Sequence, residues 1–168
     1  KFHGRTKLNG SIAAFEQDKL AFLRKHVGKE VKIMLDAHMG NSSDDAPWDV
    51  KTAIEVAKAL EPFDLFFLEE ALPYLDAEGY AELARNTTID IAGGECLSTL
   101  PEWREYIRRD SFNIAQPDAS FVGGLAEFRN IANEFAKRGR RIATHAWGAG
   151  GSLMQNVHAG FASPNIAI

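Results

Sequence analysis

The sequence predicts an α/β fold, specifically a parallel (β/α) barrel of the TIM type that is incomplete at both ends, from about its second strand to the start of its eighth. Three observations support this prediction. Short apolar runs alternate with amphipathic segments, polar residues end the apolar runs, and the sequence has no glycine-rich dinucleotide-binding turn. Because strands that alternate with helices form right-handed βαβ units, the expected sheet is parallel.

The first half of the chain contains helix–strand repeats. Residues 11–27 are expected to form a helix that starts at the N-cap Ser11 and ends before Gly28. Its apolar side chains at helical spacing are Ile12, Phe15, Leu20, Phe22 and Leu23. Buried strands are expected at residues 31–37, 63–69 and 89–95. Further helices are expected at residues 48–60, 76–85 and 101–108.

The second half of the chain repeats this scheme. Strands are expected at residues 111–118 and 140–146, and helices at residues 123–138 and 151–161. The first residues, 1–4, are typical of the end of a strand, and residues 164–168 are typical of the start of one. We therefore expect residues 1–168 to be one partial barrel domain of a longer protein.

A barrel is favoured over an open doubly wound sheet by the residues at the strand ends. The glycine pairs 93–94 and 123–124 do not form the dinucleotide-binding fingerprint that an open sheet often carries. Every interior strand instead ends near a polar residue, namely Asp36, Glu69, Glu95, Asp118 or His145. In a parallel barrel these ends converge on one mouth, where the active site lies. A complete barrel needs about 250 residues, so this chain is expected to hold most of one.

The composition excludes several functional classes. The 168 residues are 45% hydrophobic and 25% charged, with a formal net charge of −4. This acidic balance argues against a nucleic-acid partner. The absence of an apolar run of about 20 residues argues against a membrane span, and the first residues do not form a signal peptide. The single cysteine, Cys96, cannot form an internal disulfide, which is typical of a reducing, cytoplasmic setting.

Three of the strand-end acids predict a metal site. Asp36, Glu69 and Glu95 end three successive predicted strands. Converging carboxylates repel one another unless a cation lies between them. An all-oxygen ligand set selects a hard ion, so Mg²⁺ is expected, with Mn²⁺ as the second candidate. The alternative is that each acid is a helix N-cap or a solvated loop residue, and it weakens when three consecutive units share the feature.

Five short motifs, taken together, resemble a known family. They are LDAH (35–38), LEEAL (68–72), GGE (93–95), QPD (116–118) and THAWG (144–148). Their order, strand-end placement and spacing resemble the enolase superfamily, specifically its mandelate racemase-like branch. None of the motifs is specific alone, and the resemblance covers nearly the whole chain.

The resemblance implies roles for individual residues. Asp36, Glu69 and Glu95 match the three metal ligands, while Asp118 and His145 match a dyad in which the carboxylate orients the imidazole. Relatives carry a Lys-x-Lys pair at the end of the second strand. Here Lys1-x-His3 is the preferred version, and Arg5-x-Lys7 is the competing one. The resemblance also implies a separate N-terminal capping domain, absent from this chain, and an even-numbered homo-oligomer.

One residue departs from the family pattern, and two others lie next to expected metal ligands. His38 stands where asparagine is more usual, so it either touches the substrate or only lines the loop. Glu70 and Cys96 adjoin two of the expected metal ligands, but strand alternation is expected to turn them toward the helices. We therefore do not predict them as site residues.

The expected activity is removal of a proton alpha to the carboxylate of a small-molecule substrate. The resemblance is closest to sugar-acid dehydratases, which implies dehydration of an aldonic or aldaric acid to a 2-keto-3-deoxy acid. Lys1 or His3 would face one side of the alpha carbon and His145 the other, as base or as acid for the leaving hydroxyl. A racemase or epimerase that uses the same residues is the first alternative, and cycloisomerases rank lower because they usually have lysine instead of the dyad. The last alternative is a non-catalytic fragment or binding piece.

Overall fold

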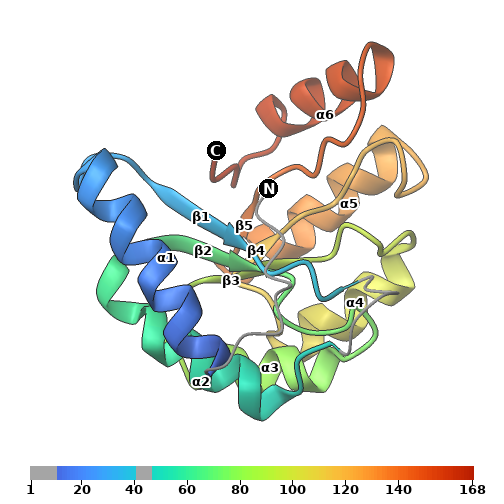
Figure 1. The fold of residues 1–168 in the computed structure, drawn as a ribbon. Coiled ribbons are helices and arrows are strands. Elements are labelled where there is room, and N and C mark those ends of the chain that lie inside the picture. Colours follow the sequence, from blue (N-terminus) through green and yellow to red (C-terminus); the bar gives the residue numbers. More distant parts are fainter. Residues whose placement is uncertain (1–10, 41–46) are drawn as a thin grey trace. The chain divides into compact units, whose positions relative to one another are not determined.

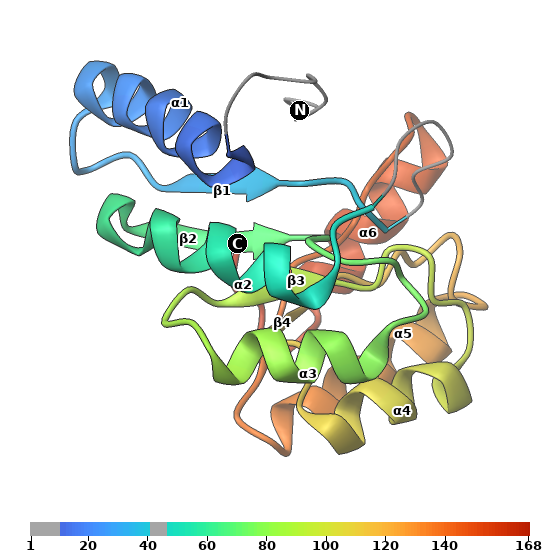
Figure 2. The same ribbon diagram turned by 60° about the horizontal axis from the view of Figure 1, so that its bottom comes forward.

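The protein is described here from a computed structural model, in which residues 11–40 and 47–168 are described. The chain divides into two compact units, Lys1–Ile91 and Ala92–Ile168. Helices and short strands alternate in both units, and all the strand pairs within each unit are parallel (Figures 1 and 2). This confirms the α/β class and the parallel pairing, while closure into a barrel stays a prediction.

The first unit contains two paired strands and the helices that precede and follow them along the chain. Its elements are α1 (Ile12–Val27), β1 (Ile33–Asp36), α2 (Val50–Leu60), the 3₁₀ helix η1 (Glu61–Phe63), β2 (Leu65–Glu69) and α3 (Ala77–Arg85). β1 pairs with β2 so that Asp36 is the register partner of Glu69. Beyond this pair, the amide of Leu68 on β2 donates to the carbonyl of Asp90 at 2.9 Å, immediately before the next strand.

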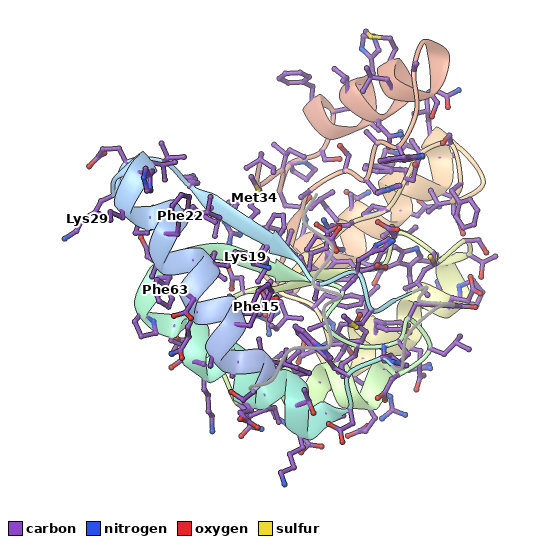
Figure 3. All side chains as sticks on the ribbon, in the orientation of Figure 1. Phe15, Lys19, Phe22, Lys29, Met34 and Phe63 are labelled. Atoms are coloured by element: carbon purple, nitrogen blue, oxygen red, sulfur yellow. The ribbon has the colours of Figure 1, made fainter. Side chains whose placement is uncertain are left out.

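Helix α1 starts and ends where the sequence predicts, but not all of its apolar side chains lie in the core. Ser11 caps the helix by accepting a hydrogen bond from the amide of Ala14. Leu20 is fully buried, whereas Phe22 is 63% exposed. Figure 3 shows Phe22 on α1, and its ring contacts His26 with ring centroids 4.2 Å apart. Apolar spacing therefore predicted the helix correctly but not which of its side chains lie in the core.

The second unit contains three strands that pair in chain order. Its elements are β3 (Ile91–Gly93, whose first residue closes the first unit), α4 (Leu100–Arg109), β4 (Ile114–Ala115), α5 (Leu125–Ala136), β5 (Arg141–Ile142) and α6 (Gly151–Phe161). β4 lies between β3 and β5, with Gly93 opposite Ala115 and Ala115 opposite Ile142. A single parallel bridge joins Ile142 to Ile166, at the segment predicted to begin a further strand.

The strands are shorter than predicted. β4 has two residues, although residues 111–118 were expected to form the strand. Its regular pairing ends before Pro117, which has no amide proton to donate. One further backbone hydrogen bond lies beyond this pairing, from the amide of His145 to the carbonyl of Pro117 at 3.2 Å. Asp118 and His145 therefore lie just beyond the regular ladder, whereas Asp36 and Glu69 are the last residues within it.

Two glycines allow the aromatic core of the second unit to pack against the end of β3. Trp103 on α4 contacts Phe112 and Phe135 edge-on, with ring centroids 6.4 and 5.8 Å apart. A Cβ on Gly93 would lie 2.9 Å from the Phe112 ring, and one on Gly94 would lie 2.2 Å from the Trp103 ring. Since side chains are excluded at both positions, the two rings support the backbone that leads directly into Glu95.

Within the described residues, no helix combines the length and the apolar content that a membrane span requires.

The packing at Gly94 predicts a specific loss of stability. Gly94 and Gly124 both have positive φ, +108° and +96°, but a Cβ on Gly124 would meet nothing within 4 Å. Both G94A and G124A should therefore incur backbone strain of roughly 1–3 kcal/mol, while only G94A also forces Trp103 to move. We expect G94A to cost about 2 kcal/mol more than G124A in urea unfolding. Equal losses for the two variants would contradict the close packing of Trp103 on Gly94.

Candidate functional site

The first unit brings two of the predicted metal ligands to neighbouring strand ends. Asp36 ends β1 and Glu69 ends β2, and the two are register partners. Adjacent strands lie about 4.8 Å apart, so the two carboxylates share one edge of the pair. The amide of His38 donates to Oδ1 of Asp36 at 2.8 Å, so the backbone just after β1 restrains this carboxylate.

His38 lies beside a second carboxylate that was not predicted. Its Nδ1 is 3.4 Å from Oε2 of Glu70 and 3.9 Å from Oδ2 of Asp36. The potential ligand atoms of Asp36, His38 and Glu70 all lie within 4.8 Å of one another. Glu70 is only 1% exposed, so its carboxylate lies inside the unit beside His38. His38 thus belongs to a cluster of ionisable groups rather than only to the loop.

The structure corrects the expectation for Glu70, because strand alternation does not apply to this residue. Glu70 follows the last residue of β2 and has a φ of +47°, in the left-handed region. Its carboxylate fits against Gly40, where a Cβ would lie 2.3 Å from Oε1. The sequence signal was weak: it consisted of an acid next to an expected ligand and a glycine in a distant loop.

The second unit brings together all three site residues predicted there. Nδ1 of His145 lies 3.0 Å from Oδ2 of Asp118, and Nε2 lies 3.2 Å from Oε2 of Glu95. The three side chains are largely shielded from solvent, at 19%, 6% and 11% exposure respectively. One imidazole therefore joins the expected orienting carboxylate to an expected metal ligand.

Asp118 is held by several hydrogen bonds besides the one to His145. Its Oδ1 accepts from the amide of Ser120 at 2.8 Å, from the hydroxyl of Ser120 at 2.6 Å and from Nδ2 of Asn156 at 2.7 Å. Burial raises the pKa of Asp118, but the hydrogen bonds from Ser120, Asn156 and His145 outweigh this effect. The net result is a pKa below the ordinary value. Asp118 is therefore a carboxylate at neutral pH, and it accepts the Nδ1 proton of His145.

The chemistry of Glu95 fits a cation. Its Oε2 is buried and accepts no hydrogen bond within the described part of the chain. Nε2 of His145 attracts it only when the imidazole is doubly protonated, since the proton on Nδ1 is directed to Asp118. A buried anionic oxygen of this kind is costly unless a positive charge compensates it. A carboxylate oxygen of this kind is the donor type that Mg²⁺ prefers.

The predicted second-strand pair lies outside the described residues. This applies to Lys1 and His3 and to the competing Arg5 and Lys7. Part of the acidic loop after β1, residues 41–46, also lies outside them.

Among curated proteins, the chain is similar to enzymes of sugar-acid metabolism. It is 36% identical over 127 residues to L-talarate/galactarate dehydratase of Salmonella typhimurium, a match that covers 76% of this chain and 30% of that protein. It is 38% identical over 115 residues to 3,6-anhydro-alpha-L-galactonate cycloisomerase of Streptomyces coelicolor, which covers 68% and 30% respectively. The chain thus spans less than a third of the length of these two relatives.

Among solved structures, the chain is similar to a racemase from Streptomyces coelicolor with bound magnesium. The match has a TM-score of 0.79 and 32% sequence identity, and it covers 92% of this chain and 40% of the racemase. Residues 2–168 also match the family described as enolase C-terminal domain-like. A match over nearly the whole sequence confirms the resemblance seen in the strand-end motifs. The chain belongs to the enolase C-terminal domain-like family.

Proposed function

We propose that the protein removes the proton alpha to a carboxylate in an Mg²⁺-dependent reaction, and that the reaction is dehydration of a sugar acid to a 2-keto-3-deoxy acid. The observation that carries this proposal is the chain of contacts from Asp118 through His145 to Glu95. It joins a proton-transfer group directly to an expected metal ligand. The talarate/galactarate dehydratase similar to this chain supports the choice of sugar acids.

In this proposal Asp36, Glu69 and Glu95 hold the metal ion, with Mn²⁺ as the second candidate. A divalent cation bound there would neutralise the charge that develops on the substrate carboxylate as the alpha proton leaves. The magnesium in the similar racemase supports this assignment. Glu95 contacts His145, and Asp36 accepts a hydrogen bond from the amide of His38. A substrate carboxylate bound to this metal ion would therefore be held close to both histidines.

His145 receives or supplies a proton through Nε2. Asp118 accepts the Nδ1 proton at 3.0 Å, so the lone pair of the neutral ring lies on Nε2. The same carboxylate stabilises the imidazolium that forms when Nε2 takes the alpha proton. Lys1 or His3 remains the candidate for the opposite face of the alpha carbon.

His38 is a second candidate for proton transfer in the same reaction. It lies two residues after Asp36, and its imidazole is 3.4 Å from the buried carboxylate of Glu70. Dehydration breaks the bond from the alpha carbon to hydrogen and the bond from the beta carbon to oxygen. The first proton goes to a base, and a second proton must reach the departing hydroxyl to form water. The enol that remains becomes the 2-keto acid when its hydroxyl loses a proton and the beta carbon gains one. Our proposal assigns the first transfer to His145 and the second to His38. Lys1 or His3 would act at the opposite face of the alpha carbon in a racemase or epimerase reaction.

The domain assignment is also part of the proposal. Residues 1–168 form part of a (β/α) barrel, the catalytic domain of a protein whose capping domain lies elsewhere in sequence. Its ligand is a small carboxylate, and it assembles as a homo-oligomer in the cytoplasm. The parallel pairing within each unit and the length of the relatives support the barrel and the separate capping domain.

Two other reactions are alternatives to dehydration. A racemase or epimerase would move the alpha proton between two groups without losing a hydroxyl, and the similar racemase favours it. A cycloisomerase is favoured by the relative with 38% identity. All three begin with alpha-proton removal, so the fate of the beta substituent distinguishes them.

The first prediction concerns the metal. We expect a panel of aldonic and aldaric acids, assayed with the full-length protein and Mg²⁺, to yield a 2-keto product with at least one member. Chelation with EDTA should abolish product formation, and added Mg²⁺ should restore it. E95Q should weaken Mg²⁺ binding measured by calorimetry, because a neutral amide replaces an anionic ligand. Undiminished Mg²⁺ affinity in E95Q would remove Glu95 from the ligand set.

The second prediction concerns His145. H145N should reduce kcat by about 10²–10⁴-fold, the usual contribution of a positioned acid or base. D118N should also lose activity, since an amide cannot stabilise the imidazolium in the same way. The control H26N changes an exposed histidine on α1 whose Nδ1 lies 2.7 Å from the carbonyl of Phe22. A fully active H145N would sink the proposed mechanism.

The third prediction separates removal of the alpha proton from loss of the hydroxyl, the step assigned to His38. With H38N, the proposed division of labour predicts that exchange of the alpha proton with D₂O continues while keto-acid formation falls by at least tenfold. The two quantities are measured on one sample by NMR. Equal loss of exchange and product would show that His38 is not specific to the leaving group.

A further inference from the structure

Asn156 on α6 is fully buried and makes three hydrogen bonds. Nδ2 donates to Oδ1 of Asp118 at 2.7 Å and to the carbonyl of Ser152 at 3.2 Å, and Oδ1 accepts from the amide of Ala119 at 2.8 Å. We propose that Asn156 is a positioning residue for the pair Asp118–His145. The proposal rests on the function proposed above, because it concerns the proton-transfer group of that reaction.

The partners determine the orientation of the amide group. Both groups that face Nδ2 are acceptors, while the group that faces Oδ1 is a backbone donor. A flipped amide would direct an oxygen at the Asp118 carboxylate and an NH₂ group at an N–H, losing all three bonds. Asn156 therefore contacts both the side chain of Asp118 and the backbone of the next residue.

Besides His145 itself, Asn156 is the described residue that links the Asp118 carboxylate to a distant part of the sequence. The other two donors to Oδ1 both come from Ser120, two residues along the same loop, and would move with it. The bond from Asn156 comes from α6, 38 residues away. With Oδ1 occupied by these donors, Oδ2 is left to His145. Rotation of the carboxylate would break the hydrogen bonds to α6 and to the imidazole together.

The buried face of α6 is built for this close approach. Its buried residues, Asn156, Ala159 and Gly160, are small or polar, and Ser152 is half-buried. Ser152 donates to the hydroxyl of Ser120 at 3.1 Å, and a Cβ on Gly160 would lie 3.3 Å from the side chain of Thr144, next to His145. The helix thus packs against the residues that flank both members of the pair, and Asn156 supplies the direct bond.

The test uses two variants of Asn156 and a matched control on the full-length protein with Mg²⁺. N156A removes the amide. N156D keeps the volume and the acceptor for Ala119, but it replaces the donor 2.7 Å from Asp118 with a second carboxylate oxygen. The control S163A removes another side-chain hydrogen bond at the end of the same helix, from the Ser163 hydroxyl to the carbonyl of Ala159, which does not reach Asp118.

We expect kcat to fall about 10–100-fold in N156A, as for other residues that orient a site group from behind, and at least as far in N156D. KM should change by less than threefold, because Asn156 lies behind Asp118 and does not face the substrate. S163A should keep kcat within twofold. Thermal unfolding identifies any variant that has lost its fold.

A spectroscopic measurement tests the positioning role independently of activity. In protein labelled with ¹⁵N-histidine, the Nδ1 proton of His145, held by Asp118, should give a downfield, protected resonance at one fixed pH. This resonance should shift or broaden in N156A and N156D and remain in S163A. Unchanged resonance and unchanged kcat in the folded Asn156 variants would overturn the proposal.

Two remaining outcomes distinguish failure of the positioning role from failure of the proposed function. If neither Asn156 variant folds while S163A does, Asn156 is a structural residue and the positioning role is rejected. If the wild-type protein acts on no sugar acid, the proposed function fails, while the resonance still shows whether Asn156 holds the Asp118–His145 pair.

Discussion

The hydrogen bond from His145 to Asp118 is the interaction on which the candidate site of the second unit depends. A buried carboxylate is stable only when its oxygens accept several hydrogen bonds or face a positive charge. Asp118 meets this requirement through Ser120, Asn156 and His145, and these bonds keep its pKa below the ordinary value. Because Asp118 stays anionic, it selects the Nδ1 proton of His145 and leaves Nε2 facing Glu95.

The same requirement explains why the site needs both strand ends and helices. The carboxyl ends of parallel strands bring Glu95, Asp118 and His145 to one edge of the sheet in the second unit. This edge alone does not fix the rotation of a carboxylate. That restraint comes from α6, whose small buried residues allow Asn156 to reach Asp118. At the end of β3, Gly93 and Gly94 similarly leave room for Phe112 and Trp103 beneath the backbone that carries Glu95.

Much of this arrangement could be predicted from the sequence, because strand ends are a local feature. Alternating apolar runs located the α-helices and the paired strands of the described residues, but not the 3₁₀ helix η1. The rule that functional residues follow parallel strands brought Asp118 and His145 to one edge, and the family resemblance implied that they form a dyad. The burial of α1 was predicted less well, since helical spacing does not tell which apolar side chains meet the rest of the unit. Glu70 was excluded because alternation was extended one residue beyond β2, into a backbone with positive φ. Asn156 gave no signal, because its contact depends on the rotation of a helix that follows 38 residues later.

The two histidine–carboxylate pairs differ in a way that bears on the proposed division of labour. Nδ1 of His145 lies 3.0 Å from Asp118, a good hydrogen-bond distance, whereas Nδ1 of His38 lies 3.4 Å from Glu70. A base that removes a weakly acidic carbon-bound proton must be held in one orientation, because the reaction depends on its alignment with the alpha carbon. A group that protonates a departing hydroxyl meets a more basic and more mobile oxygen, so it tolerates a looser hold. The tighter pair is therefore the better base, and the looser pair beside Asp36 is the better donor to the leaving group.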